Sequence, residues 1–402
     1  MPRVILHCDC NSFYASVETA LNPEYKNVPM AVCGSESDRH GIVLAKNELA
    51  KKFNIVTAET VYSAKKKCPN LVITSPHHDE YLKFSKRVNQ IYSRYTDVIE
   101  AFGIDESWLD VTASQRLFGN GMSIAEKIRR EVKEEIGITV SIGVSFNKVF
   151  AKLGSDYKKP DAITLIDKDN FRDIVFPLPV SDLLFVGNKT TSRLTSLGIK
   201  TIGDLARTNR KFLIMKFGKM GDVLYKYANG LDDSPVEAVR EDAKSISCGL
   251  TFKHDLISFN DCRVGINYLV EKLGARLRKY GQLCGTVSLT VKDNRLHSIQ
   301  RQRQINPRTD ITKEISNVAY KILCDEWHRE VPIRMITVSV SNLQKKIECK
   351  KQITFFENEE ENKREKNSKR DIALDKIRQK FGANSIMNGS VIDTDIGIYE
   401  LD

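Results

Sequence analysis

Three carboxylates most constrain how this chain can fold, because they stand at the ends of segments that otherwise favour buried strands. Asp9 follows an apolar run at residues 4 to 8, which predicts a short buried strand. Asp105 and Glu106 lie between two further strand-like runs, so a hairpin with both acids at its tip is expected. If the first strand lies beside that hairpin, all three carboxylates meet at one edge of a sheet.

Three neighbouring negative charges repel one another, and burying them without compensation is costly. Divalent metal is the usual remedy, and hard oxygen ligands favour Mg²⁺, whose coordination substrate phosphates commonly complete. Two such ions would drive an in-line phosphoryl displacement. The pattern therefore predicts a phosphoryl-transfer site with two Mg²⁺ ions held by Asp9, Asp105 and Glu106. For the pair Asp105 and Glu106 taken alone, a solvated hairpin tip is the alternative interpretation.

The bulk properties favour a multidomain protein that binds a polyanion. The 402 residues are enough for two to four domains, and 62 Lys and Arg against 52 Asp and Glu give a net charge of +10. The nine cysteines include no C-x-x-C pair, which argues against a zinc framework and favours reduced thiols in a cytosolic protein. No signal peptide or long apolar segment is present, so a cytoplasmic location is expected.

The first part of the chain has an α+β pattern. From residue 2 to about 166, strand-like and helix-like runs alternate, which predicts an antiparallel sheet backed by two helices and interrupted by an insertion at residues 11 to 76. One helix is expected over residues 79 to 95. The other is expected to begin at Ser123 with a capping box and to end at Gly137.

Residues 167 to 233 are typical of short helices joined by glycine turns. The stretch around Gly187 resembles a helix-hairpin-helix, in which backbone N–H groups near a helix N-terminus meet a phosphate. Phe185 stands where that unit usually has a second glycine, so an ordinary helix-turn-helix core is the alternative interpretation.

A second α+β unit is expected over residues 246 to 345, after a linker at 234 to 245. This unit holds 16 Lys and Arg against 9 Asp and Glu, a net charge of +7, which favours nucleic acid as its partner. Residues 346 to 402 are nearly neutral in charge, with 11 basic against 12 acidic residues. Residues 357 to 370 predict a solvated linker or helix, and residues 372 to 387 a helix of unknown role.

Several separated motifs together resemble the Y-family of DNA polymerases, and most closely the DNA polymerase IV group of Gram-positive bacteria. The motifs are Asp9 to Glu18, Gly103 to Ser107, Ser145 to Lys152 and Lys159-Pro160. The resemblance covers residues 3 to about 345 and implies a right-hand polymerase. Its expected parts are a ferredoxin-like palm at 1–10 and 77–166, small fingers at 11–76, a helix-hairpin-helix thumb at 167–233, the linker at 234–245, an α+β little finger at 246–345 and a tail at 346–402.

By this resemblance, Asp9 and Asp105 bridge two Mg²⁺ ions, with Glu106 assisting the ion that activates the primer 3′-hydroxyl. The backbone carbonyl of Cys10 is expected to add a metal ligand. Tyr14 corresponds to the family's steric gate, whose ring rejects a sugar 2′-hydroxyl by clash.

The resemblance also implies substrate contacts beside the metal site. Phe13 is expected to be a buried ring at the substrate site, and Lys159 corresponds to a lysine that grips the incoming phosphates. Lys51 occupies a position where relatives commonly carry arginine, and it supplies a point charge without a bidentate fork. Glu48 stands where relatives commonly have tyrosine. A carboxylate there would repel phosphate unless Lys51 or Lys52 pairs with it, so Glu48 is excluded from the site.

A short tail segment suits docking into a partner's groove, because it starts with a polar residue and carries bulky apolar ones between charged flanks. Its residues Gln352, Ile353, Phe355 and Phe356 resemble the bacterial sliding-clamp-binding pentapeptide. By composition alone, an edge strand capping the preceding domain is the alternative interpretation.

The resemblance implies a template-directed, error-prone DNA polymerase that performs translesion synthesis without proofreading. Its expected partners are primer–template DNA, deoxynucleoside triphosphates (dNTPs) and a sliding clamp, and a monomer is expected. Two rival interpretations stay open. A palm-type nucleotidyl cyclase would need no template, and a catalytically silent, clamp-tethered relative would bind DNA without extending a primer.

Overall fold

Two compact units make up the chain. The computed structural model describes residues 2–34, 41–239, 242–327, 331–348, 359–382, 385–391 and 394–397. One unit comprises Met1–Ser37 and Gly41–Arg240, and the other comprises Asp38–His40 and Glu241–Asp402. Each unit has hydrophobic core residues of its own, so each can be understood from its own packing.

The N-terminal unit is built on a five-stranded sheet with strand order β5-β6-β1-β7-β8. Its strands are β1 (Ile5–Cys10), β5 (Ile99–Ala101), β6 (Glu106–Asp110), β7 (Val140–Ser145) and β8 (Ile163–Ile166). All neighbouring pairs are antiparallel except β7 and β8, which are parallel. The buried first strand and the β5–β6 hairpin beside it are confirmed, and every residue of β1 is buried.

Two helices pack their apolar side chains against this sheet, as the apolar periodicity predicts. These are α4 (His78–Tyr92) and α6 (Gly121–Ile136). The predicted capping box at Ser123 is wrong: α6 begins two residues earlier, and the Asn120 side chain accepts a hydrogen bond of 2.9 Å from the Ser123 backbone N–H. The predicted end is confirmed, since Gly137 has φ +82, the left-handed region that favours glycine.

The helix α7 (Lys148–Tyr157) packs unusually close to the sheet. A Cβ on Gly143 of β7 would come within 1.8 Å of the Ala151 carbonyl oxygen, so only glycine permits this approach. The close contact fixes α7 against β1 and β7, and it thereby holds the lysines of α7 beside the edge where the acids lie.

The insertion after β1 folds as a small sheet with helices. Its strands, in the order β3-β2-β4, are β2 (Met30–Cys33), β3 (Val43–Lys46) and β4 (Val72–Thr74). Its helices are α1 (Phe13–Leu21), η1 (Pro23–Asn27), α2 (Glu48–Lys51) and α3 (Val61–Lys67). Asn47 joins these parts, because its side chain accepts from the Ala50 N–H at the start of α2 and donates to the Val28 carbonyl.

The rest of the N-terminal unit is a bundle of short helices, as expected for residues 167 to 233. The helices are α8 (Phe171–Val175), η2 (Val180–Asp182), α9 (Asn188–Ser196), α10 (Ile202–Arg207), α11 (Arg210–Phe217) and α12 (Lys219–Ala228); a further short helix, α5 (Gln115–Phe118), precedes α6. Phe185 has φ +69, a conformation that glycine adopts without strain. The backbone of the turn is therefore left-handed at Phe185, although the usual glycine is absent there.

The C-terminal unit is a four-stranded antiparallel sheet with the order β11-β10-β12-β9, and its α+β character is confirmed. The strands are β9 (Ser245–Leu256), β10 (Gln282–Asp293), β11 (Ser298–Thr309) and β12 (Ile333–Lys345). The helices are α13 (Phe259–Lys279), α14 (Thr312–Glu326) and α15 (Glu359–Phe381), with 3₁₀ turns η3 (Lys346–Glu348) and η4 (Gly389–Val391). The core lies between the sheet and the pair α13 and α14.

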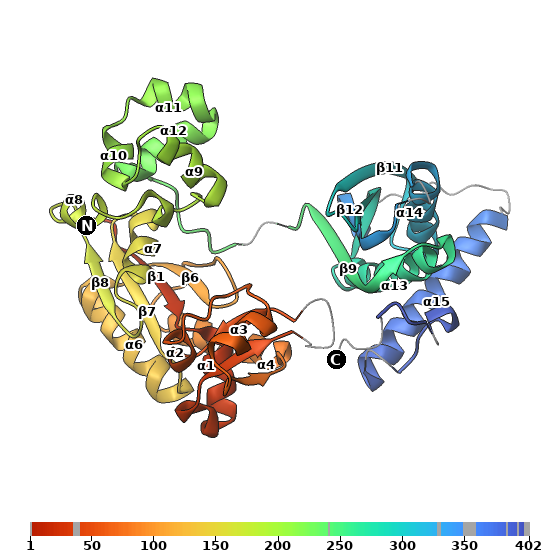
Figure 1. The fold of residues 1–402 in the computed structure, drawn as a ribbon, viewed down its shortest axis with the longest axis horizontal. Helices are drawn as coiled ribbons and strands as arrows, with labels where there is room; N and C mark the ends of the chain where they lie inside the picture. Colours follow the sequence, from red (N-terminus) through yellow and green to blue (C-terminus); the bar gives the residue numbers. More distant parts are fainter. Residues whose placement is uncertain are drawn as a thin grey trace. The chain divides into compact units, whose positions relative to one another are not determined.

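The tail helix α15 corrects one prediction. The helix expected over residues 372 to 387 instead begins at Glu359 and ends at Phe381. It therefore includes most of residues 357 to 370, for which the sequence predicts a solvated linker or helix. It packs against α13 and α14 (Figure 1). Across the described part of the chain, no helix combines the length and apolarity needed to span a membrane.

Candidate active site

The sheet places the three predicted acids next to one another. Asp9 at the end of β1 is the direct cross-strand partner of Glu106 at the start of β6. The Cys10 N–H donates to the carbonyl of Asp105 over 3.0 Å, which ties the hairpin tip to the same strand end. The local fold therefore follows from strand pairing, and it brings together acids that are 96 residues or more apart in sequence.

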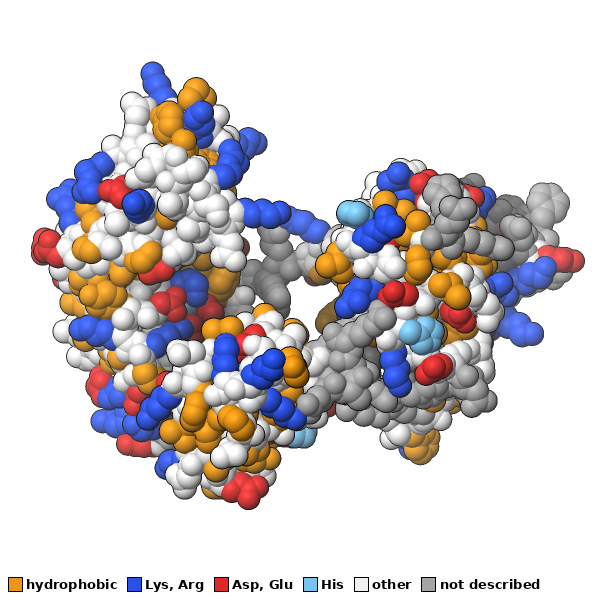
Figure 2. All heavy atoms as spheres, viewed as in Figure 1, with side chains coloured by type: hydrophobic (Ala, Val, Ile, Leu, Met, Phe, Trp, Pro, Cys, Tyr) orange, Lys and Arg blue, Asp and Glu red, His pale blue; other side chains and the backbone are white. Residues whose placement is uncertain are grey.

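A cavity of about 380 Å³ opens at this edge of the sheet. It is lined by Asp9, Cys10, Ser12, Phe13, Tyr14, Leu44, Ala45, Lys46, Lys51, Thr57, Ile104, Asp105, Glu106 and Lys159. All eight residues that the sequence assigned to catalysis, metal binding and substrate contact are in this set. Figure 2 shows acidic and basic side chains side by side in the middle of this unit, over β1, β6 and α7.

Two lysines neutralise part of the acidic edge. The Lys159 ammonium lies 2.7 Å from Asp9 Oδ2 and also 2.7 Å from Asp156. The Lys152 ammonium lies 2.5 Å from Glu106 Oε2. Sequence analysis placed Lys159 at the phosphates but gave no role to Lys152, although Lys152 ends one of the quoted motifs. Both lysines are held in place by α7 and the segment after it.

Burial and mutual repulsion shift the acids in different directions. Burial raises the pKa of Asp9 to about 6, although Lys159 works against this rise. Burial also raises the pKa of Asp105, and the nearby charge of Glu106 adds to that effect. Burial acts to raise the pKa of Glu106 as well, but contacts with His7 and Lys152 outweigh it and lower the pKa to about 2.

The donor set suits a divalent cation. Asp9 and Asp105 are partly desolvated and repelled by Glu106, so a cation between them would relieve a cost that the protein otherwise bears. Among the described residues, no three histidine, cysteine or carboxylate side chains are already gathered closely enough to hold a metal ion. In the arrangement seen here, lysine ammonium groups balance Asp9 and Glu106 instead.

His7 is a residue of this region that sequence analysis missed. It is fully buried on β1, with Nδ1 2.8 Å from Ser155 Oγ and Nε2 3.3 Å from Glu106 Oε2. Burial lowers the pKa of His7. The alternation of β1 places His7 and Asp9 on one face of the strand, which is a sequence signal that could have identified it.

The Tyr14 ring is held by stacking. It lies parallel to the Tyr81 ring at 4.1 Å between centroids and meets His78 edge-on at 5.9 Å. The Tyr81 hydroxyl in turn donates to the buried Glu18 carboxylate over 2.5 Å. Phe13, the preceding residue, is turned into the core. Both rings line the cavity, but Phe13 is buried whereas Tyr14 is partly exposed there.

Glu48 does not line the cavity, and a lysine neutralises it. Lys51 Nζ lies 2.6 Å from Glu48 Oε1, and the Ser12 hydroxyl donates to the same oxygen over 3.3 Å. The exclusion of Glu48 from the site agrees with this placement. Lys46 was missed by sequence analysis, although it lines the cavity and donates to the Thr57 hydroxyl over 3.0 Å. Burial, followed by the charge of Lys51, lowers the pKa of Lys46.

The expected clamp-binding residues lie outside the described part of the chain. Gln352, Ile353, Phe355 and Phe356 fall between Glu348, where the 3₁₀ turn η3 ends, and Glu359, where α15 begins.

Three family models match separate segments of this chain. A model of the impB/mucB/samB family matches residues 8–156, and a model of that family's C-terminal domain matches residues 243–355. A model described as the thumb domain of DNA polymerase-iota matches residues 181–232.

Similar proteins extend over nearly the entire length. A protein named DNA polymerase IV from Acetivibrio thermocellus is 46% identical over 396 residues, covering 98% of this chain and 98% of that protein. A protein of the same name from Clostridium kluyveri is 39% identical, covering 98% of this chain and 99% of that protein. A solved Y-family DNA polymerase chimera matches with a TM-score of 0.75 and 25% identity, over 85% of this chain and 99% of that one.

Proposed function

This chain belongs to the impB/mucB/samB family of Y-family DNA polymerases, in the DNA polymerase IV group, and we propose that it performs error-prone translesion synthesis at the cavity of Asp9, Asp105 and Glu106. It is a DNA-directed DNA polymerase. The observation that carries the assignment of the site is the pairing of β1 with β6, which brings acids from two distant segments to one cavity that lysines also line.

Asp9, Asp105 and Glu106, with the carbonyl of Cys10, are the groups that would hold two Mg²⁺ ions. When bound, these ions lower the pKa of the primer 3′-hydroxyl and balance the charge of the triphosphate and the departing pyrophosphate. Burial of Asp9 and Asp105 suits these roles, because a desolvated carboxylate interacts more strongly with a cation than an exposed one does.

Lysine side chains of the cavity bind the incoming triphosphate in this proposal. Lys159, Lys51 and Lys46 all line the cavity and come from three different segments. Lys51 shares its charge with Glu48, and Lys159 shares its charge with Asp9 and Asp156. Each lysine offers a mobile point charge, which favours the triphosphate without fixing one orientation.

Tyr14 acts as the steric gate. Stacking on Tyr81 leaves its ring little freedom to rotate away from the cavity. A ribose 2′-hydroxyl approaching that ring would clash, whereas deoxyribose would fit, so discrimination comes from repulsion of the wrong sugar.

The remaining parts of the proposal follow the family pattern. We assign the palm to residues 1–10 and 77–166, the fingers to 11–76, the thumb to 167–233, a linker to 234–245 and the little finger to 246–345. The tail carries the clamp-binding residues Gln352, Ile353, Phe355 and Phe356. Synthesis proceeds without proofreading, by a cytoplasmic monomer that reaches primer–template DNA through the clamp.

Single-nucleotide insertion on four templates tests the proposal. Primer–templates that differ only in the first templating base are each incubated with one dNTP at a time. The complementary dNTP should be inserted fastest on each template, with occasional wrong insertions. Insertion that ignores the templating base would overturn the proposal. Conversion of a nucleoside triphosphate to a cyclic product without DNA would favour the cyclase interpretation instead.

A further inference from the structure

The tail helix α15 is anchored to the C-terminal unit through its acidic residues. Asp371, which is 2% exposed, accepts a hydrogen bond from the Thr312 N–H at the start of α14 over 2.8 Å and lies 3.4 Å from Arg278. Asp375 forms a second ion pair with Arg278, at 2.5 Å. Arg378 of α15 pairs with Glu271 of α13 at 2.6 Å. These contacts fix which face of α15 is buried.

In the C-terminal part of α15 the charges are sorted by face as a result, whereas its exposed acids, Glu359, Glu361 and Glu365, all precede residue 366. Between residues 366 and 380, the exposed charged side chains are all cationic, and both acids are turned toward the domain. The exposed cations are Lys366, Lys369, Arg370, Lys376 and Lys380, which we call the tail basic face. The tail as a whole is nearly neutral in charge, so its composition hides this separation.

Most of the tail basic face lacks acidic neighbours. Lys369 pairs with Glu365, and Arg370 pairs with Asp371. For Lys366, Lys376 and Lys380, no carboxylate of the described chain lies within ion-pair distance. Three ammonium groups are therefore available for an anionic partner.

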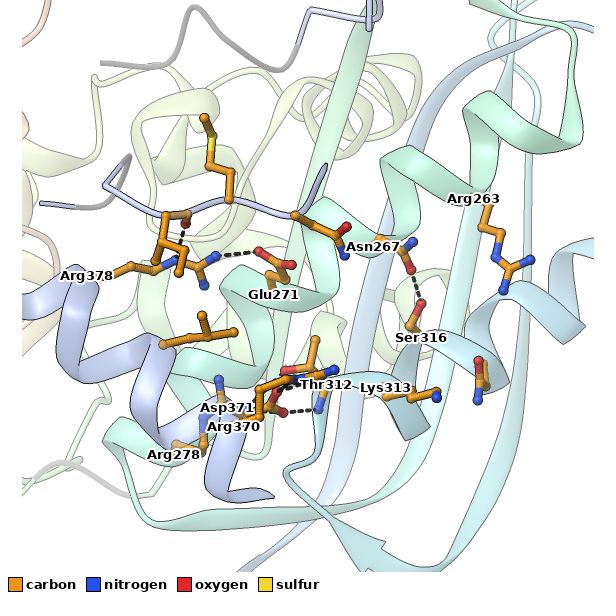
Figure 3. Close-up of a pocket in the computed structure, with 15 residues that line it drawn as sticks. Arg263, Asn267, Glu271, Arg278, Thr312, Lys313, Ser316, Arg370, Asp371 and Arg378 are labelled. Atoms are coloured by element: carbon orange, nitrogen blue, oxygen red, sulfur yellow. Dashed lines mark hydrogen bonds and ion pairs between the residues drawn. The ribbon is translucent and has the colours of Figure 1, made fainter. Parts of the chain in front are cut away.

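A cavity of about 400 Å³ continues this surface onto the body of the unit. Five cationic and two acidic side chains line it. Arg278, Arg370 and Arg378 form ion pairs within the unit, whereas Arg263 and Lys313 have no carboxylate of the described residues within ion-pair distance. Figure 3 shows Arg263 and Lys313 on one side of the cavity, across from Arg370 of the tail basic face. Arg378 and Glu271, joined by a dashed line, close another side. The cavity and the tail basic face thus share Arg370.

We propose that the tail basic face, with Arg263 and Lys313 at the cavity, binds the phosphodiester backbone of duplex DNA as a contact separate from the polymerase cavity. From Lys366 to Lys380 the helix rises about 21 Å, at 1.5 Å per residue. Because duplex DNA carries one negative charge per about 1.7 Å of its axis, several phosphates fall within that length. This assignment goes beyond the proposed function, since it gives the tail a partner of its own.

Charge favours DNA over a membrane surface. A helix that lies on a membrane presents a continuous apolar face to the lipid. The exposed large apolar side chains of α15, Ile372 and Phe381, are nine residues apart and lie on opposite sides of the helix, so they form no continuous apolar face. The exposed charged side chains between 366 and 380 are cationic. DNA is also present wherever this polymerase works, so a weak backbone contact on the same chain gains from high local concentration.

Salt-dependent DNA binding by the full-length chain tests this proposal. The variant Lys366→Gln, Lys376→Gln, Lys380→Gln removes three outward charges and leaves the anchoring acids intact. Its affinity for a labelled 30-base-pair duplex should fall roughly tenfold at 50 mM salt. The slope of log affinity against log salt should become shallower by about 2.7, near 0.9 for each lost phosphate contact.

The matched control is Lys26→Gln, Lys66→Gln, Lys86→Gln, which makes the same change in net charge with exposed lysines of the N-terminal unit. This control variant should keep the DNA affinity and the salt slope close to those of the unmodified chain. Equal effects of the two variants, or no change in slope for the tail variant, would overturn the proposal. A tail variant that loses binding to poly-glutamate as strongly as to DNA would assign the surface to acidic protein partners instead. Single-nucleotide insertion at saturating DNA should stay unchanged, which separates this test from that of the polymerase activity.

Discussion

Asp9 is where stability and chemistry conflict most directly. Burial raises its pKa from 3.8 to about 6. Between pH 4 and pH 6, Asp9 is therefore protonated in the folded chain but ionised in the unfolded chain. Stability from this group is therefore fully present below about pH 4 and is lost as pH rises through 6. The cost at pH 7 is about 3 kcal/mol, at 1.36 kcal/mol per pKa unit.

Asp9→Asn should therefore stabilise the metal-free chain. The amide removes the cost of burying a charge but takes from Lys159 one of its two carboxylate partners, so the net gain expected at pH 7 is about 1 to 2 kcal/mol. Chemical denaturation at pH 4, 6 and 7 measures this gain, which should shrink toward pH 4. The control Asp156→Asn changes an exposed partner of the same lysine and should shift stability by less than about 0.5 kcal/mol. If Asp9→Asn is no more stable than the unmodified chain at pH 7, burial of the charged Asp9 carboxylate does not destabilise the fold.

Tyr14→Ala should admit ribonucleotides, because the ring that clashes with the 2′-hydroxyl is removed. The preference for dCTP over CTP opposite guanine should fall about 100-fold, measured as the ratio of the two kcat/KM values. Tyr14→Phe keeps the ring and its stacking on Tyr81, so it should keep the preference. If Tyr14→Ala discriminates between the sugars as well as the unmodified chain does, Tyr14 is not the gate.

Individual site residues differ in how far the sequence could predict them. Asp9 and Asp105 could be found because each follows or interrupts an apolar run, and the quoted motifs identified Tyr14 and Lys159. The alternation of β1 could have indicated His7, but no local signal indicates that His7 and Lys152 both contact Glu106. Their contacts with Glu106 span 99 and 46 residues of sequence and exist only because β1, β6 and α7 pack together.

Among the helices, α6 gives a sharp test of where a helix begins. Asn120→Ala should cost about 1 kcal/mol, because its side chain accepts the hydrogen bond from the Ser123 N–H. Ser123→Ala should cost less, since the Ser123 hydroxyl only donates to the same Asn120 oxygen. Thermal or chemical denaturation of the two variants compares these costs. A larger loss for Ser123→Ala would restore Ser123 as the capping residue.

Helices and strands could be predicted in kind, but their ends and their partners could not. Strand β1 and the β5–β6 hairpin could be predicted from short apolar runs, because such runs and the polar residues that bound them are local signals in the sequence. Strand β10, however, extends from Gln282 to Asp293, although the alternating apolar residues Val287, Leu289 and Val291 indicate only its middle part. The burial of Asp371 depends on docking against α14, and no local pattern of the charged tail reveals it.

For the entire chain, the tail segment at 352 to 356 links the polymerase to its proposed clamp. Deleting these five residues should lower affinity for the clamp by at least about tenfold, because main anchors such as Phe355 and Phe356 are lost. Synthesis on short primers without clamp should not change. The affinity is measured by binding the full-length protein, with and without the deletion, to sliding clamp immobilised on a surface. A deletion variant that binds the clamp as tightly as the unmodified chain would favour the edge-strand interpretation.

The most direct test of the proposed site is single-turnover insertion by Asp105→Ala, with Mg²⁺ and a saturating primer–template. Loss of one of the three acids that line the cavity should reduce the rate of bond formation by at least about 1,000-fold, near 4 kcal/mol in barrier height. Binding of the primer–template, measured in parallel, should stay within about threefold. Insertion at an unchanged rate would contradict a catalytic centre at Asp9, Asp105 and Glu106.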